Sequence, residues 1–162
     1  MLLAAKILLT ISTLGYSLIP FAFDSNKTHW FNPSWTKHAR FHCVWQVMSY
    51  VYIAIVALVL IWTAGDAKWP IWIAATLSFC AYGGFWTAVF LRNKLDLALV
   101  DEVNGVPPFM LPIFGESDAN ITLFTTAVLI LMTGCLVLAG AAVAIETLAD
   151  ATAVVPPLSS TL

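Results

Sequence analysis

Two histidines, His38 and His42, lie four residues apart at the start of a long apolar segment. On an α-helix this spacing places both imidazoles on one face, and Gln46 and Ser49 continue the same stripe along the helix. Imidazole exchanges protons near neutral pH, and it is also a common ligand of transition metals. The stripe therefore predicts a site for acid–base chemistry or for a metal ion.

Charged and aromatic residues that could complete an acid–base site lie close to this stripe in the sequence or in a later loop. A metal-free mechanism would use His38 or His42 as the acid–base group. Arg40 would polarise an oxygen of the substrate, and Asp24 would orient the histidine. The residues expected to bind the substrate are His29, Trp35, Trp45, Gln46, Ser49, Asp101 and Glu102.

A metal site is the second interpretation. Its ligands would be His29, His38, His42 and Asp24, a nitrogen and oxygen set that suits zinc or non-haem iron. Two histidines without the glutamate of an HExxH motif do not by themselves specify a metal, so no cofactor is predicted outright. A third interpretation is structural, with Lys37 and Arg40 reaching lipid headgroups and with His38 and His42 forming hydrogen bonds between helices.

The composition indicates a membrane protein. Of the 162 residues, 60% are hydrophobic and 10% are charged, and the mean hydropathy is +0.89. A soluble domain is about half apolar and about a quarter charged. The formal charge of −2, without a run of Lys and Arg, excludes a nucleic-acid partner. The expected partner is the lipid bilayer.

Four apolar segments are long enough to cross a bilayer as helices, at approximately residues 8–23, 43–64, 69–91 and 121–148. They lack the alternation of barrel strands. We therefore predict an all-α, polytopic membrane protein, with residues 1–162 forming a single four-transmembrane-helix bundle. The long loops at residues 24–37 and 92–120 would lie on one side of the membrane and the termini on the other. Pro33 and Ser34 predict the start of the second helix, with Ser34 as the N-cap.

Two signals for the orientation of the bundle disagree. Most of the Lys and Arg residues fall on the long-loop side, which favours a cytosolic location for these loops. The N-x-T sequons at Asn26 and Asn120 fall on the same side and make both residues possible glycosylation sites, which would place the loops in a lumen. Because short sequons often arise by chance, we expect cytosolic loops.

The apolar segment Val106–Gly115 contains three prolines, which exclude a regular helix. A segment too apolar for water and too interrupted to span a membrane is expected at the interface or folded over the mouth of the bundle. Two interpretations of this segment remain open. The segment is a lid over the site, or it is an anchor at the membrane surface.

The stretch THWFNPSWTKHARFHCVWQ, Thr28–Gln46, resembles the signature of a family of small four-helix membrane proteins with N-P-x-W, H-A-R-F-H and W in series. In length and number of spans, the chain also resembles the EXPERA class, which includes the sterol Δ8–Δ7 isomerase and the sigma-2 receptor. This looser resemblance implies isomerisation or binding of a sterol-like ligand inside a small helical bundle. The chain departs from that class because its second and third spans contain no acidic residues.

These observations together predict a membrane-embedded enzyme. It would carry out isomerase-, cyclase- or hydrolase-type acid–base chemistry on a small lipophilic substrate. The alternative is a non-catalytic accessory subunit of a membrane complex or a protein that binds a lipophilic ligand. Small residues between Met132 and Ala144 allow close helix packing, either within the bundle or in a homodimer.

Overall fold

Four long helices account for most of the chain. A computed structural model describes all residues except 101–102, 104, 106–107, 112–114 and 154–162, and for residues 141–153 it describes the backbone alone. The helices are α1 (Leu2–Asp24), α2 (Lys37–Thr63), α3 (Trp69–Leu95) and α4 (Ala119–Ala153). Each contains a stretch long and apolar enough to cross a membrane. The predicted four-helix, multi-pass membrane fold is therefore confirmed.

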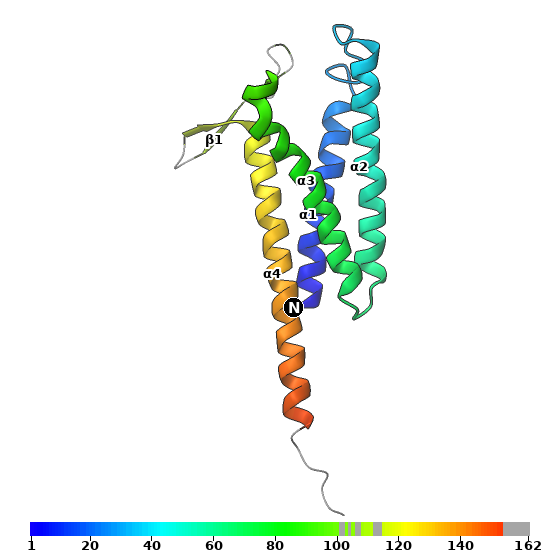
Figure 1. The fold of residues 1–162 in the computed structure, drawn as a ribbon, viewed down its shortest axis with the longest axis vertical. Coiled ribbons are helices and arrows are strands. Elements are labelled where there is room, and N and C mark those ends of the chain that lie inside the picture. Colours follow the sequence, from blue (N-terminus) through cyan, green and yellow to red (C-terminus); the bar gives the residue numbers. More distant parts are fainter. Residues whose placement is uncertain (101–102, 104, 106–107, 112–114, 154–162) are drawn as a thin grey trace, which may run out of the picture.

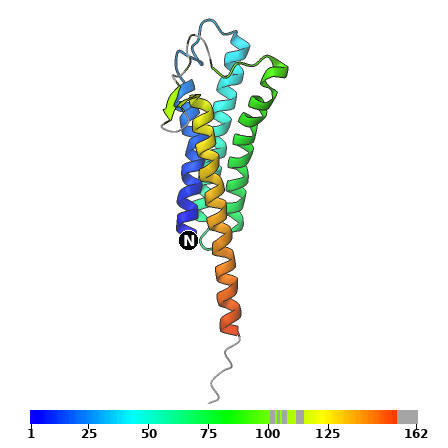
Figure 2. The same ribbon diagram turned by 90° about the vertical axis from the view of Figure 1, so that its left-hand side faces the viewer.

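Successive helices run in opposite directions, so the two long connections lie at one end of the bundle (Figure 1). The N-terminus and the short α2–α3 turn lie at the other end. Helix α1 contacts all three other helices and packs most extensively against α4 and α2 (Figures 1 and 2). Helix α4 has 35 residues and continues past the N-terminus as a single helix (Figure 2). At about 1.5 Å per residue it exceeds the roughly 30 Å hydrocarbon core, so its last turns extend beyond the bundle.

Helix α2 begins before the predicted apolar segment. Its N-cap is Thr36, whose hydroxyl accepts a hydrogen bond from the backbone N–H of Ala39 at 3.1 Å. The prediction of Ser34 as the cap is wrong, because the Ser34 hydroxyl donates instead to the side chain of Asn32. As a result, His38 and His42 both lie in the first turns of α2.

The described part of the proline-rich connection forms a small hairpin. Strand β1 (Phe109–Leu111) pairs antiparallel with β2 (Gly115–Ser117). The hairpin projects from the side of the bundle at the long-loop end (Figure 1), and the side chain of Met110 is 76% exposed. The described residues of this segment therefore do not form a lid over the bundle.

The centre of the bundle is a close contact between α1 and α3. A Cβ atom at Gly15 would lie 2.7 Å from the Tyr82 hydroxyl oxygen. That hydroxyl donates a hydrogen bond to the backbone carbonyl of Ser12. The buried ring of Tyr16 packs edge-on against Tyr82, with centroids 5.8 Å apart, and against Tyr50, with centroids 6.1 Å apart. Gly15 therefore allows Tyr82 to reach the backbone of α1.

Small residues of α4 perform the predicted packing role within the bundle. A Cβ atom at Gly134 would lie 3.1 Å from the side chain of Leu9 and 3.2 Å from Leu8. The absence of a side chain at Gly134 thus lets α4 approach α1. In hydrocarbon such close packing is a main source of helix association, because burying apolar surface from lipid gains little.

We expect Gly15→Ala to lower the free energy of unfolding by about 1–3 kcal/mol, because the new methyl group would overlap the Tyr82 hydroxyl. The matched control is Gly83→Ala, since a Cβ atom at Gly83 has no neighbour within 4 Å. That variant should be neutral or more stable by up to about 1 kcal/mol, because Ala favours the helix. Unfolding in mixed detergent micelles measures both.

Adding Tyr82→Phe to Gly15→Ala removes the overlapping oxygen and should restore part of the lost stability. If Gly15→Ala is as stable as Gly83→Ala, the close contact between α1 and α3 does not constrain the bundle.

Candidate functional site

The α1–α2 connection is held by the side chain of Asn32, which is only 4% exposed. Its Nδ2 donates to the backbone carbonyl of Thr28 at 2.8 Å. Its Oδ1 accepts hydrogen bonds from the Ser34 backbone N–H at 3.0 Å and from the Ser34 hydroxyl at 2.6 Å. The Asn-Pro-Ser sequence therefore forms a turn that fixes the residues preceding it, including His29.

The His29 imidazole lies at the end of α1, between a hydroxyl, a carboxylate and an indole. Its Nδ1 is 2.7 Å from the Thr28 hydroxyl oxygen and 3.7 Å from Asp24 Oδ1. The ring packs edge-on against Trp35, with centroids 5.1 Å apart. The side chains of His29 and Asp24 are 31% and 26% exposed. The imidazole is thus fixed in position but remains accessible.

The hydrogen-bond network assigns the tautomer of His29. Asn26 Oδ1 accepts from the Thr28 backbone N–H at 2.7 Å, which fixes the orientation of the amide, and it lies 2.6 Å from the Thr28 hydroxyl. The other acceptor near this hydroxyl is the carbonyl of Phe23, at 3.4 Å. Because neither oxygen can donate, the hydroxyl proton is directed to one of them, and the hydroxyl accepts from His29. Nδ1 then carries the proton of the neutral ring, and Nε2 is the basic nitrogen.

This network also gives the sequon at Asn26 a structural role. Its Nδ2 donates to the Phe23 carbonyl at 2.8 Å while its Oδ1 binds Thr28. The second possible acceptor, Asn120, is half-buried in the first turn of α4 and donates to the Leu99 carbonyl at 3.3 Å. Both amides are used within the chain, and glycosylation at either residue stays a prediction.

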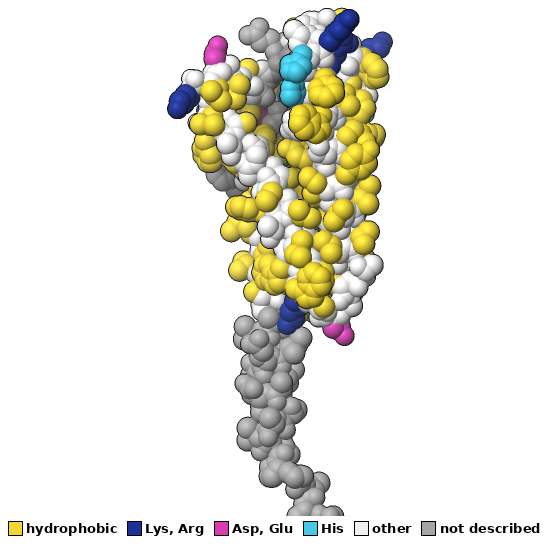
Figure 3. Space-filling view, turned by 45° about the vertical axis from the view of Figure 1, so that its right-hand side comes forward, with side chains coloured by type: hydrophobic (Ala, Val, Ile, Leu, Met, Phe, Trp, Pro, Cys, Tyr) yellow, Lys and Arg dark blue, Asp and Glu magenta, His cyan; other side chains and the backbone are white. Residues whose placement is uncertain are grey.

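The other two histidines form a pair on α2. His38 Nε2 and His42 Nε2 are 3.0 Å apart, and their rings are nearly perpendicular. The His42 ring stacks on Trp45, with centroids 5.8 Å apart, and the His38 ring stacks on Phe41 at 6.5 Å. Figure 3 shows histidine side chains as one surface patch near the long-loop end, next to hydrophobic side chains.

The polar stripe lies on one face of α2, and most of this face is directed away from the other helices of the bundle. His38, His42 and Gln46 are exposed. The stripe becomes half-buried only at Ser49 and Tyr50, where Gln46 donates to the Tyr50 hydroxyl at 3.2 Å. The buried face of α2 consists instead of apolar residues: Val47, Ala54, Ala57 and Ile61.

The predicted site residues that the structure describes make their side-chain contacts within two groups. Among the described residues, no hydrogen bond or ion pair joins the Asp24–His29 pair to the His38–His42 pair. Arg40 is half-buried. Asp101 and Glu102 lie outside the described residues.

The proposed metal ligands do not gather at one point either. In the described part of the chain, no three His, Cys, Asp or Glu side chains are placed to hold one metal ion. The four-ligand set of the sequence interpretation is thus not assembled in this structure.

Two contributors to the His29 group were missed from the sequence. Thr28 is the nearest partner of His29, and its position directly before the histidine was an available signal. The Cys43 thiol lies beside the indole of Trp30 and close to Asp24. No sequence pattern connects Trp30 with Cys43, because only the turn brings α2 back to α1.

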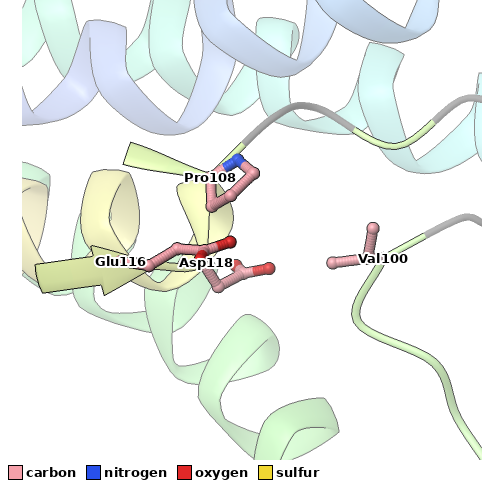
Figure 4. A pocket seen from close by; sticks show the side chains of 4 residues that line it. All are labelled: Val100, Pro108, Glu116 and Asp118. Carbon is pink, nitrogen blue, oxygen red and sulfur yellow. The ribbon is translucent and has the colours of Figure 1, made fainter. Parts of the chain in front are cut away.

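A separate hollow of about 520 Å³ lies at the third connection, lined by Val100, Pro108, Glu116 and Asp118 (Figure 4). It is wide open to its surroundings. Asp118 has a structural role, because its carboxylate accepts a hydrogen bond from the Ile121 backbone N–H at 2.9 Å at the start of α4. This hollow contains no histidine and is distinct from both histidine groups.

No family model matches the chain, and neither the curated proteins nor the solved structures include a match. The class of the protein rests on its fold. It is a small, multi-pass integral membrane protein.

We expect Thr28→Val to weaken the preference of neutral His29 for a proton on Nδ1, because only the more distant Asp24 carboxylate then remains near Nδ1. The tautomer population of the neutral His29 ring should then shift toward the form that carries its proton on Nε2. Nitrogen-15 NMR of histidine-labelled protein in micelles measures this ratio. The chain has three histidines, so His29→Gln identifies the signal.

The control for this experiment is Thr87→Val, because the exposed Thr87 hydroxyl donates to the Gly83 carbonyl of its own helix. An unchanged His29 tautomer in Thr28→Val would contradict the assigned network.

Proposed function

We propose that this membrane protein is an enzyme that carries out acid–base chemistry on a small lipophilic substrate, with His29 as the catalytic base. The observation that supports this proposal is the 2.7 Å contact of His29 Nδ1 with a Thr28 hydroxyl that itself donates to Asn26, from which we infer that Nε2 is the basic nitrogen. A base held in one tautomer is oriented before the substrate arrives.

Each neighbour of His29 has a defined part in this chemistry. Nε2 takes a proton from a C–H or O–H group of the substrate, and the ring becomes an imidazolium. Asp24, with its carboxylate oxygen 3.7 Å from Nδ1, stabilises that positive charge. Return of the proton to a different atom of the substrate gives an isomerisation or a cyclisation. Transfer from water instead of from the substrate gives a hydrolysis. None of these steps requires a redox partner.

The surroundings of His29 favour an apolar substrate. Trp35 packs against the imidazole, and Trp30 packs edge-on against Phe21 with centroids 6.0 Å apart. These rings lie at the end of the membrane-spanning helix α1, where Trp and Tyr side chains commonly meet the headgroup region. A molecule dissolved in the bilayer could reach His29 without crossing bulk water. The looser resemblance to the EXPERA class favours a sterol-like substrate.

A non-catalytic accessory subunit is the second candidate, and the outer face of α2 favours it. Phe41 and Trp45 are 62% and 60% exposed there. Large aromatic side chains of this kind are frequent at the centres of protein interfaces. In this role the histidines would contact a partner and would not turn over a substrate.

We test the proposal by expressing the wild-type protein, His29→Gln and Thr87→Val in the same host and comparing membrane lipid extracts by mass spectrometry. The wild type and Thr87→Val should convert the same lipophilic compound. His29→Gln should lower the rate by about 10²- to 10⁴-fold, the usual contribution of a general base. Asp24→Asn should lower it less, because Asp24 acts through His29.

Folding must be matched before the rates are compared, so all variants are first checked for the same unfolding midpoint in detergent. A folded His29→Gln variant that converts the compound at the wild-type rate would refute the assignment of His29 as the base. A wild type that changes no extracted compound, combined with stable co-purification of a membrane protein, would support the accessory role.

A further inference from the structure

We propose that His38 and His42 form a two-histidine binding site for a divalent first-row transition metal on the outer surface of α2. The site is separate from His29 and does not depend on the proposed function. It differs from the four-ligand set suggested by the sequence, because His29 and Asp24 are not part of it. Water or a headgroup oxygen would complete the coordination.

The separation of the two nitrogens matches adjacent ligands of one ion. Metal–imidazole bonds are about 2.0–2.1 Å, so two ligands at 90° have nitrogens about 2.9 Å apart, and two tetrahedral ligands about 3.3–3.4 Å. The observed distance between His38 Nε2 and His42 Nε2 is 3.0 Å. In the metal-free chain this contact is a hydrogen bond between the two rings, so the nitrogens already lie close to either spacing and a metal ion can replace the shared proton after a small rotation of one ring. Imidazole ligands suit Cu²⁺, Ni²⁺ and Zn²⁺, and Cu²⁺ is expected to bind most tightly.

The two rings are also held near this geometry by their neighbours. His38 stacks on Phe41 with an interplanar angle of 10°, and His42 stacks on Trp45 with an angle of 29°. Phe41 also packs edge-on against His42. Contacts of this kind restrict the rotamers of both histidines, which lowers the entropy lost when the metal binds.

Charge and access are compatible with a cation at this position. Lys37 and Arg40 are the nearest cationic residues in the sequence. Neither has the three- or four-residue spacing from both histidines that would place it on their face of α2. Both histidines are exposed and lie in the first two turns of α2, at the long-loop end of the bundle, where a hydrated ion can reach them. Neutral imidazoles can bind the ion directly, whereas in the absence of metal one Nε2–H donates to the other nitrogen.

The test is a titration of purified protein in nanodiscs with Cu²⁺ alone, using an affinity tag without histidine. Calorimetry should give one ion per chain, and the electron paramagnetic resonance spectrum should show two nitrogen ligands. His38→Gln should weaken binding by at least tenfold, whereas His29→Gln should leave it unchanged. By the Irving–Williams order, Ni²⁺ and Zn²⁺ should bind more weakly than Cu²⁺.

The strictest control exchanges two residues of the stripe, His42→Gln together with Gln46→His. This variant keeps the composition, but it places the histidines eight positions apart, about 12 Å along the helix axis, which is too far for one ion. It should bind Cu²⁺ as weakly as His38→Gln. Wild-type binding no tighter than that of the exchange variant would overturn the proposal, as would one ion shared by two chains.

Discussion

The hydrogen bond from the Tyr82 hydroxyl to the Ser12 carbonyl ties α3 to α1 at the centre of the bundle. Apolar side chains gain little by leaving lipid for other apolar side chains, so helices in a membrane rely on close packing and on bonds of this kind. Gly15 makes the bond possible, because any Cβ atom there would occupy the space of the hydroxyl. Tyr82 also packs edge-on against Phe124 of α4, so the same tyrosine side chain connects α3 with both α1 and α4.

The position of α1 determines where the chemistry can occur. Because α1 contacts every other helix, its end at Asp24 is fixed relative to the start of α2. The turn organised by Asn32 then covers the short distance between the two helices. His29 lies within this turn, between the aspartate that ends one helix and the indole of Trp35 just before the next. The geometry of the histidine thus depends on the packing of the bundle below it.

The two histidine groups illustrate different kinds of organisation. The His38–His42 pair is set by local features of one helix, because residues four apart on any α-helix come together and the aromatic neighbours belong to the same helix. The His29 group depends on the turn between α1 and α2, on the hydrogen bonds of Asn26, Thr28 and Asn32 within that turn, and on Asp24 at the end of α1. Its geometry is therefore specific to this fold, whereas that of the pair would survive in any helical segment with the same spacing and stacked aromatic neighbours.

The sequence alone determined the number of spans, the antiparallel arrangement of the helices and the shared face of His38 and His42. Each follows from a local cause, namely the length of an apolar run or the helical repeat. Only the tertiary structure decided which face of α2 is buried. A helix apolar on nearly all sides carries little information about its orientation, and the small residues Ala54 and Ala57 face the core instead of the polar stripe. The tertiary structure also decided that the Asp24 carboxylate lies next to the His29 imidazole, because this contact depends on the turn that the Asn32 side chain holds.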